Sequence, residues 1–224
     1  DVPSMPFGGR EEFCFTPDSK AVVYTARVAG REEAWSTDFD LYVVGVDAAA
    51  GPVCLTEANE AWDTQPVFSP DGKTLAYLAM ERPGHESDRM RIVLRDWDQA
   101  ARRAGAARTL TQDFDRSLQS IVFAPDGERI FASGAHLGQV ALWGIAVKDA
   151  SVKILVDEGS VRSPSWAGDR LLFGLDHLRS PVELHTILPD GDGFTRISHV
   201  NDVKVAAARM GEPEQFTFTG ANGD

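Results

Sequence analysis

The acidic residues of one short segment are the side chains best suited to bind a ligand. Residues 81–88 include Glu81, Arg82, Glu86 and Asp88. Carboxylates that face a cavity can form charge-assisted hydrogen bonds with a primary ammonium group. The alternative is a solvated loop in which arginine pairs with its own neighbouring acids. These four residues are therefore the candidate substrate-binding set, and residues 35–40 could line the same face.

The other chemistry-bearing residues form no complete catalytic or metal-binding motif. The sequence has no Gly-x-Ser-x-Gly nucleophile elbow, and neither a Gly-x-Gly-x-x-Gly nor a Walker pattern. Residues 190–193 carry the acids of a calcium loop but lack the later bidentate glutamate, which favours a hairpin turn. No common zinc spacing relates the histidines, which are His85, His136, His177, His185 and His199. We expect no catalytic residue, no metal and no cofactor in this chain.

A repeated turn motif is the main evidence for the organisation of the chain. It reads Phe15-Thr16-Pro17-Asp18, Phe68-Ser69-Pro70-Asp71 and Phe123-Ala124-Pro125-Asp126, with a worn copy at Trp166-Ala167-Gly168-Asp169. The aligned aspartates are 53, 55 and 43 residues apart. Proline presets φ, aspartate hydrogen-bonds the backbone ahead of it, and a following glycine accepts a left-handed conformation, so the motif closes a hairpin. Repeats of about 40–50 residues are typical of four-stranded propeller blades.

Further strand-like runs complete each repeat. Residues 89–95 alternate apolar residues with arginines, which is the period of a half-exposed strand. No window shows a sustained, capped helical period, and residues 100–107 are expected to form a loop. The predicted third and fourth strands lie at 40–46 with 53–56, 89–95 with 108–111, 139–147 with 152–156, and 182–187 with 195–198. The sequence predicts an all-β fold, a β-propeller segment of four four-stranded blades over residues 1–203, with units near 7–58, 59–112, 113–157 and 158–203.

Four blades leave two end faces without a neighbour. A closed four-bladed ring is one alternative, but we expect an incomplete ring whose earlier blades lie upstream of Asp1. Residues 204–224 are expected to be a linker and a first strand, over 214–219, leading into a further domain. Exposed end faces could also pair two chains into a homo-oligomer.

The composition restricts the partners of the chain. With 34 acidic and 22 basic residues the net charge is −12, which repels phosphate backbones and anionic lipids. We therefore expect neither nucleic-acid nor membrane binding, and no apolar run approaches the ~20 residues of a spanning helix. The charge is typical of a soluble protein, and attraction of a cationic group is the alternative. Cys14 and Cys54 form no disulfide framework and are expected to be buried in strands.

Three segments carry a more specific signal than the turns. They are Trp35-Ser36-Thr37-Asp38-Phe39-Asp40, Met80-Glu81-Arg82-Pro83-Gly84-His85-Glu86-Ser87-Asp88 and residues 204–224. In this order, the segments resemble the propeller of the prolyl oligopeptidase family of serine peptidases, in its bacterial dipeptidyl-peptidase 5 and acylaminoacyl-peptidase branch. The resemblance covers essentially the whole chain. It implies the later part of a seven-bladed propeller, followed by an α/β-hydrolase domain that is missing from this sequence.

The resemblance also implies a function. In that family the hydrolase domain carries a Ser–Asp–His triad, and the propeller caps the active site and filters peptide substrates. The implied reaction is acyl transfer to serine and hydrolysis, which releases dipeptides or blocked residues from peptide N-termini. Because the nucleophile elbow is absent here, no catalytic residue can be carried over. The alternative is a non-catalytic, TolB-like propeller that binds a protein partner. A periplasmic or secreted location is expected with the peptidase interpretation.

Overall fold

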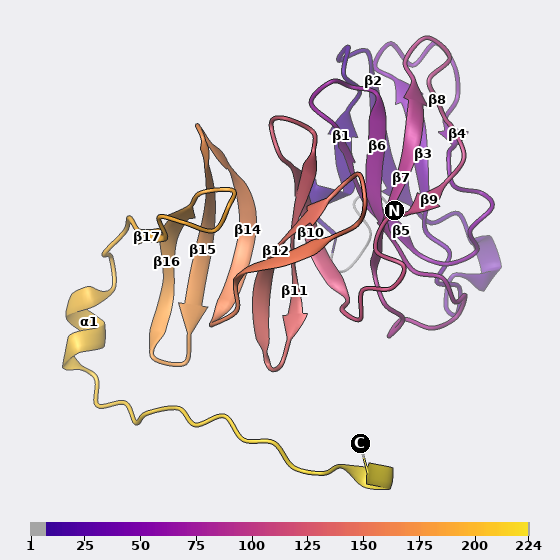
Figure 1. The fold of residues 1–224 in the computed structure, drawn as a ribbon. Coiled ribbons are helices and arrows are strands. Elements are labelled where there is room, and N and C mark those ends of the chain that lie inside the picture. The colour runs from indigo at the N-terminus through magenta and orange to yellow at the C-terminus, as the bar shows by residue number, and fades with distance from the viewer. Residues whose placement is uncertain (1–7, 224) are drawn as a thin grey trace.

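The order of strands follows the predicted repeat. A computed structural model describes residues 8–223, so the predicted boundary at residue 7 lies outside the described residues (Figure 1). Four antiparallel units follow one another, each with its strands paired in chain order. Unit 1 contains β1 (Phe13–Phe15), β2 (Ala21–Ala26), β3 (Asp40–Gly45) and β4 (Val53–Cys54). Unit 2 contains β5 (Asp63–Phe68), β6 (Thr74–Ala79), β7 (Arg91–Asp98) and β9 (Arg108–Thr109).

The last two units have longer strands. Unit 3 contains β10 (Leu118–Phe123), β11 (Arg129–His136), β12 (Gln139–Ala146) and β13 (Val152–Val156). Unit 4 contains β14 (Ser160–Ala167), β15 (Arg170–His177), β16 (Ser180–Ile187) and β17 (Thr195–Arg196). A single parallel bridge, Val140 with Ser160, connects β12 to β14 and thereby joins these two units. The all-β prediction is confirmed, and each unit contains four antiparallel strands, with one further short strand in unit 2.

The repeated turns form as their sequence predicts. In unit 2, the Asp71 carboxylate accepts hydrogen bonds from the Ser69 hydroxyl at 2.6 Å and the Lys73 amide at 3.1 Å. Gly72 has φ +70°, the left-handed conformation that glycine adopts without strain. A Cβ at this position would lie 2.8 Å from the Pro17 side chain. The turn of unit 2 therefore packs against the turn of unit 1, and glycine is required both by its φ and by this contact.

The hydrophobic core lies between neighbouring units rather than within one sheet. Along β6, Leu75 and Tyr77 pack in a cluster shared with unit 1, whereas Ala76 and Leu78 pack in a cluster shared with unit 3. A third cluster joins units 3 and 4 through side chains that include Phe131 and Phe173. Because β6 is covered on both faces, nearly all its residues are apolar. The units therefore stack as adjacent sectors, as Figure 1 shows.

A shared polar contact attaches the outermost strand of three units. The hydroxyl of Thr56 accepts a hydrogen bond from the Leu41 amide at 2.9 Å. The hydroxyls of Thr111 and Ser198 accept equivalent bonds from the amides of Ile92 and Leu184. Each hydroxyl thus accepts a hydrogen bond from a main-chain amide of the third strand, beside the fourth strand. The fourth strand is only two residues long in these units. The short outer strand is thus held by a side chain as well as by its ladder.

The region predicted as a loop in unit 2 contains a strand of two residues. The strand β8 (Arg103–Ala104) pairs with the end of β7. Two short 3₁₀ helices, η1 (Arg10–Glu12) and η2 (Gly30–Glu32), lie in unit 1. The expectation that residues 100–107 are not helical is confirmed.

The tail differs from its prediction in two respects. Residues Asp202–Ala207 form a short helix, α1, although no helical period was evident there. Six residues are too few to show a period, and contacts of Asp202 with Arg196 and His199 hold its first turn. The strand expected at 214–219 is not formed, because no strand of the described chain pairs with it. The 3₁₀ turn η3 (Ala221–Gly223) follows.

The tail runs along one end of the sheets after α1 (Figure 1). The Gln215 amide donates a hydrogen bond to the Leu137 carbonyl, in the β11–β12 turn, at 3.1 Å. Glu212 forms an ion pair with Arg179, in the β15–β16 turn. Two side-chain contacts therefore attach an otherwise exposed segment to the turns of units 3 and 4.

Candidate functional site

The predicted substrate-binding loop connects β6 to β7 in unit 2, and its acidic residues differ in their hydrogen-bond and ion-pair partners. The Asp88 carboxylate accepts hydrogen bonds from the amides of Glu81 at 2.8 Å and Arg82 at 2.9 Å. Burial acts to raise the pKa of Asp88, but these amides and that of Arg89 outweigh it and hold the pKa below its usual value. Asp88 therefore stabilises the loop as a charged group.

The remaining members of the predicted set point to different partners. Glu81 pairs with the buried Arg91 guanidinium at 2.6 Å. Arg82 is exposed and lies 3.5 Å from Asp88. Glu86 is exposed and has no hydrogen bond or ion pair among residues 8–223. Of the four, Glu81, Arg82 and Glu86 are exposed, although Glu81 and Arg82 are paired within the protein, and Asp88 is largely covered. The assignment of the set to substrate binding stays a prediction.

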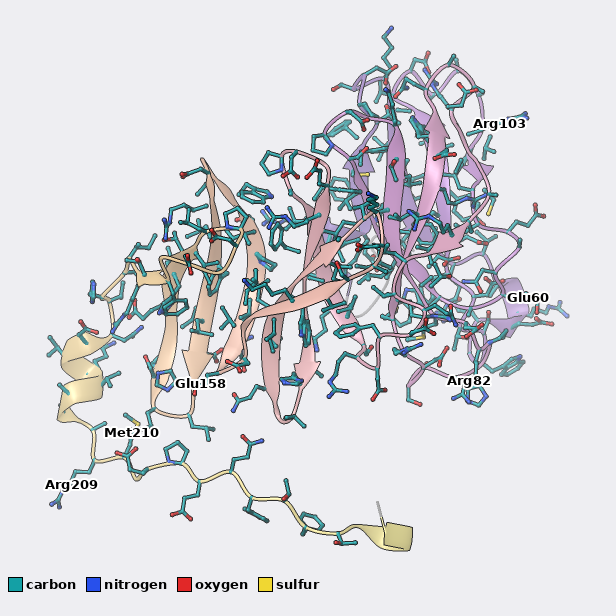
Figure 2. The ribbon with its side chains drawn as sticks, viewed as in Figure 1. Glu60, Arg82, Arg103, Glu158, Arg209 and Met210 are labelled. Atoms are coloured by element: carbon teal, nitrogen blue, oxygen red, sulfur yellow. The ribbon has the colours of Figure 1, made fainter. Side chains whose placement is uncertain are left out.

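The loop lies beside the segment that the sequence analysis placed on the same face. The Gly84 amide donates a hydrogen bond to the Thr37 hydroxyl at 2.7 Å, which connects residues 81–88 to residues 35–40. Arg82 and Glu60 lie at the same end of the molecule in Figure 2, with Arg103 at the opposite end of unit 2. The junction of units 1 and 2 therefore carries two of the three distinctive segments.

Two carboxyl groups with buried oxygen atoms lie at this junction, of which Asp38 belongs to the segment 35–40 and Asp63 was not predicted. Asp63, the first residue of β5, is completely buried, and its Oδ1 accepts a hydrogen bond from the Asn59 amide at 2.9 Å. Its Oδ2 and the Oδ1 of Asp38 are buried without a hydrogen-bond partner among residues 8–223. Burial raises the pKa of Asp63 to about 8, and Asp40 and Asp38 add to the effect. At neutral pH the Asp63 side chain is therefore mainly a neutral acid.

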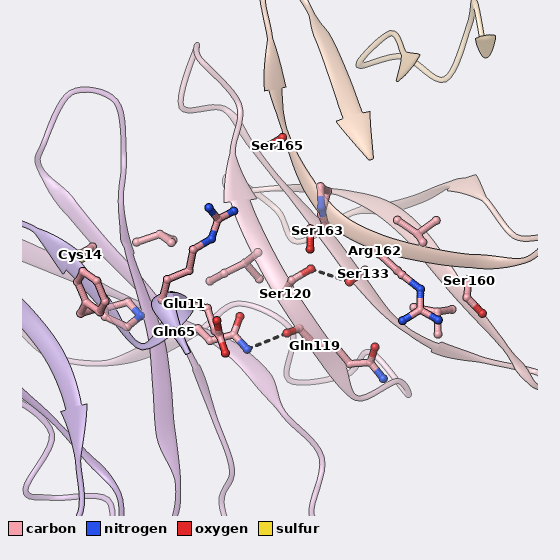
Figure 3. Close-up of a pocket in the computed structure, with 18 residues that line it drawn as sticks. Glu11, Cys14, Gln65, Gln119, Ser120, Ser133, Ser160, Arg162, Ser163 and Ser165 are labelled. Atoms are coloured by element: carbon pink, nitrogen blue, oxygen red, sulfur yellow. Dashed lines mark hydrogen bonds between the residues drawn. The ribbon is translucent and has the colours of Figure 1, made fainter. Parts of the chain in front are cut away.

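A groove lies along the inner strands of all four units. Its volume is about 620 Å³, and each of the strands β1, β5, β10 and β14 contributes to its wall. Most of its polar side chains are uncharged, and Figure 3 shows those of Gln65, Gln119, Ser120 and Ser163. None of the four predicted substrate-binding residues lines it. We call this feature the axial groove, because the innermost strands of stacked sectors surround their common axis.

The sequence carries a repeated signal for the groove. In each repeat the residue three positions before the aromatic of the turn is polar, and in units 2, 3 and 4 these residues are Gln65, Ser120 and Ser163. All three line the groove. A polar residue that recurs at this point of the first strand indicates a wall that faces a cavity.

No cluster of three or more histidine, cysteine or acidic side chains in residues 8–223 is arranged to hold a metal ion. Cys14 and Cys54 are free thiols, and both are partly rather than fully buried. Within the same described range no helix has the length and apolar character needed to cross a membrane.

Comparison with known proteins gives relatives by sequence and neighbours by fold. No family model matches the chain. It is 30% identical over 208 residues to a dipeptidyl-peptidase 5 of Porphyromonas gingivalis, covering 90% of this chain and 29% of that protein. The chain spans about a third of the length of the curated relatives it matches.

Two solved structures show the same fold. An acylaminoacyl peptidase of Pyrococcus horikoshii superposes with a TM-score of 0.67 at 16% identity, over 94% of this chain and 31% of that one. A putative TolB of Agrobacterium tumefaciens superposes with a TM-score of 0.63 at 20% identity, over 83% and 63%. At these identities the likeness concerns the fold alone, which is that of a propeller.

Proposed function

Because this chain belongs to the prolyl oligopeptidase family, in which it corresponds to the β-propeller of the dipeptidyl-peptidase 5 branch, we propose that it controls the access of peptides to a serine peptidase site. The observation that carries the proposal is the 30% identity to a dipeptidyl-peptidase 5 across 90% of the chain. The catalytic triad would lie in an α/β-hydrolase domain of the same polypeptide. A ring of seven blades, of which these units are the later ones, is part of the proposal.

The reaction proposed for the whole polypeptide is removal of dipeptides from peptide N-termini. Such an enzyme must recognise a free α-ammonium group, and carboxylates are its natural partners. The exposed Glu86, on the loop joined to residues 35–40, supports the assignment of this loop to substrate binding. Cleavage of blocked N-terminal residues, as in acylaminoacyl peptidases, is the alternative specificity, and it needs no carboxylate for the ammonium group.

The first experiment determines the sequence that follows Asp224 in the complete polypeptide. We expect a Gly-x-Ser-x-Gly elbow within about 200 residues after Asp224, which is the usual size of such a domain. The polypeptide carrying both parts should hydrolyse a dipeptidyl chromogenic substrate, and replacing the elbow serine with alanine should abolish turnover. The 224-residue chain alone should not turn the substrate over. A stop codon soon after Asp224 would contradict the proposal and favour the TolB-like interpretation.

The second experiment tests the specificity. Glu86→Gln in the complete polypeptide should raise KM for substrates with a free N-terminus about tenfold, as expected for one charge-assisted bond. The same variant should leave KM for N-acetylated substrates unchanged. Glu57→Gln, another exposed glutamate, is the matched control. Equal KM values for Glu86→Gln and the parent with free N-termini would exclude Glu86 from ammonium binding.

A further inference from the structure

The innermost strands of units 2, 3 and 4 are each interrupted at the axial groove. In β5 the ladder to β6 shifts register between Thr64 and Val67, so Gln65 and Pro66 have no separate register partners. In β14 the ladder to β15 shifts between Arg162 and Ser165, at Ser163 and Pro164. In β10 it shifts between Leu118 and Ser120. Such bulges take main-chain groups out of their ladder and redirect side chains.

Two of these bulges hold a non-glycine residue in the left-handed conformation. Gln65 has φ +55° and Ser163 has φ +47°. Neither residue is of a type that favours this conformation, so the backbone is held there by its surroundings. Both residues precede a proline, and both line the groove. Because the same bulge occurs in units 2 and 4, it is a regular feature of the groove wall rather than a local irregularity.

The wall of the groove is polar but nearly without free charge. The Gln65 amide spans to the next unit and donates to the Gln119 carbonyl at 2.7 Å, and the hydroxyls of Ser120 and Ser133 are 2.6 Å apart (Figure 3). The charge of Arg162 is offset by a two-bond contact with Asp176. The other charged side chains of the wall, Arg10 and Glu11, carry opposite signs. A chain of net charge −12 therefore has an axial groove that is close to neutral.

These features fit a ligand that is itself polar, uncharged and extended. Main-chain groups released by a bulge, amides and hydroxyls can each donate and accept hydrogen bonds. A peptide main chain offers donors and acceptors at regular intervals, and its recognition by main-chain bonds does not depend on its side chains. Phosphate-containing ligands are disfavoured, because the wall has no excess of cations.

We propose that the axial groove binds an extended peptide segment through its main chain, at the bulges that contain Gln65, Gln119 and Ser163. The choice of a peptide as ligand rests on the proposed function, but binding itself requires no hydrolase domain. The groove would hold the part of a substrate that lies beyond the residues recognised at the reacting end. Because its contacts are to the main chain, it would accept many sequences.

The test places a fluorophore in the groove. Ser163→Cys puts a thiol at an exposed position of the wall. The native thiols should remain largely unlabelled at neutral pH, because burial raises the pKa of Cys14 to about 12 and also raises that of Cys54. Ser151→Cys, exposed in the turn before β13, is the matched control outside the groove. Both labelled chains are titrated with an end-blocked, uncharged octapeptide and with the same peptide N-methylated at alternate amides.

The two peptides separate main-chain recognition from other binding. We expect a saturable change for the Ser163 label with the unmodified peptide, and at least tenfold weaker binding of the N-methylated one. The Ser151 label should not respond. Equal affinity for the two peptides, equal response of the two labels, or no saturable change at Ser163 would each overturn the proposal.

A second variant tests the wall without a label. Gln65→Ala removes the amide that connects the β5 bulge to the Gln119 carbonyl of the next unit. A bulge that has lost one neutral hydrogen bond is held less firmly, and peptide binding should weaken about fivefold. Gln215→Ala, on the tail, should bind as the parent does. Unchanged affinity of a folded Gln65→Ala chain would contradict the role of this bulge. Peptidase activity plays no part in these measurements, so their failure and the failure of the proposed function are separate results.

Discussion

Two buried carboxyl groups, one at the junction of units 1 and 2 and one in unit 4, have opposite charge states. Asp63 at the junction of units 1 and 2 is fully covered, and Glu183 in unit 4 is 2% exposed. Asp63 receives one hydrogen bond at Oδ1, and its Oδ2 has no partner within the described chain. Glu183 accepts bonds from the Ser198 hydroxyl, the Asn201 amide and the Asn201 side chain, among others.

The difference in donors reverses the charge state. Burial raises the pKa of Asp63 to about 8. The Ser198 hydroxyl, followed by the amides of Asn201 and Val200, lowers the pKa of Glu183 to about 2. Burial alone therefore does not determine whether an acid is charged. The number of groups that donate hydrogen bonds to its carboxylate determines the direction of the pKa shift. In unit 4, groups at the start of the tail donate hydrogen bonds to both oxygens of Glu183. At the junction beneath the candidate loop, Asp63 keeps one oxygen without a hydrogen bond from the described chain and a strongly shifted pKa, and functional sites often contain such acids.

Removing the ionisable group of Asp63 should have the largest effect. The unfolded value is near 3.8 and the folded value about 8, so the folded state binds the extra proton and the free energy of unfolding falls as pH rises between these values. The full loss corresponds to about 6 kcal/mol. The Asp63→Asn chain should match the parent near pH 4 and become increasingly more stable toward pH 8. Urea titrations at several pH values check this, and parallel pH profiles for the two chains would refute it.

Replacing the hydroxyl beside Asp40 should have an intermediate effect. Thr56→Val removes the acceptor of the buried Leu41 amide and the donor to Asp40, which lies 2.7 Å away. A buried donor left without a partner costs about 1–3 kcal/mol. Thermal unfolding at pH 6 measures the loss, with Thr111→Val in unit 2 as the matched variant. A change below about 0.5 kcal/mol in both would show that the shared hydroxyl contact does not stabilise the outer strands.

Replacing Glu183 should lower the free energy of unfolding only at pH values where the Glu183 carboxylate is charged. Its folded pKa lies below its unfolded value of about 4.5, so its stabilisation is present above that pH and is lost as pH falls toward 2. The Glu183→Gln chain should be less stable than the parent at pH 7 and should converge with it near pH 2. This is the reverse of the pattern for Asp63→Asn. If the deficit of Glu183→Gln grew on acidification, the assignment of a charged Glu183 would be wrong.

The smallest effect is expected at the candidate loop. Glu86 is exposed and has no partner among residues 8–223, so Glu86→Gln should change stability by less than about 0.5 kcal/mol. Thermal unfolding of this variant also serves as the control for the kinetic test of Glu86. A large loss of stability would show that the residue has a structural role.

The contrast between the two acids also shows which structural features could be predicted from the sequence. The turn at Asp71 and Gly72, and the strands on either side of it, followed from local chemistry, because proline, aspartate and glycine act on neighbouring residues. Asp63 could not be assigned in the same way. Its burial depends on packing across a junction between two units, and no local pattern records that contact.

The same limit applies to the candidate sites. The sequence suggested that residues 35–40 could share a face with residues 81–88, and one hydrogen bond does connect the two segments. It could not show that Asp88 and Glu81 bind within the protein. The bulges at Gln65 and Ser163 depend on the register of neighbouring strands, which is set in three dimensions. The helix α1 was missed because contacts of Asp202 with Arg196 and His199, rather than a periodic sequence, hold its first turn.

The central claim, that this propeller controls the access of peptides to a peptidase site, is tested most directly by substrate size. The complete polypeptide should be given one N-terminal sequence in two forms, as a free decapeptide and fused through a short linker to a tightly folded protein. We predict kcat/KM at least 100-fold lower for the fusion. Equal kcat/KM values for the decapeptide and the fusion would contradict the claim.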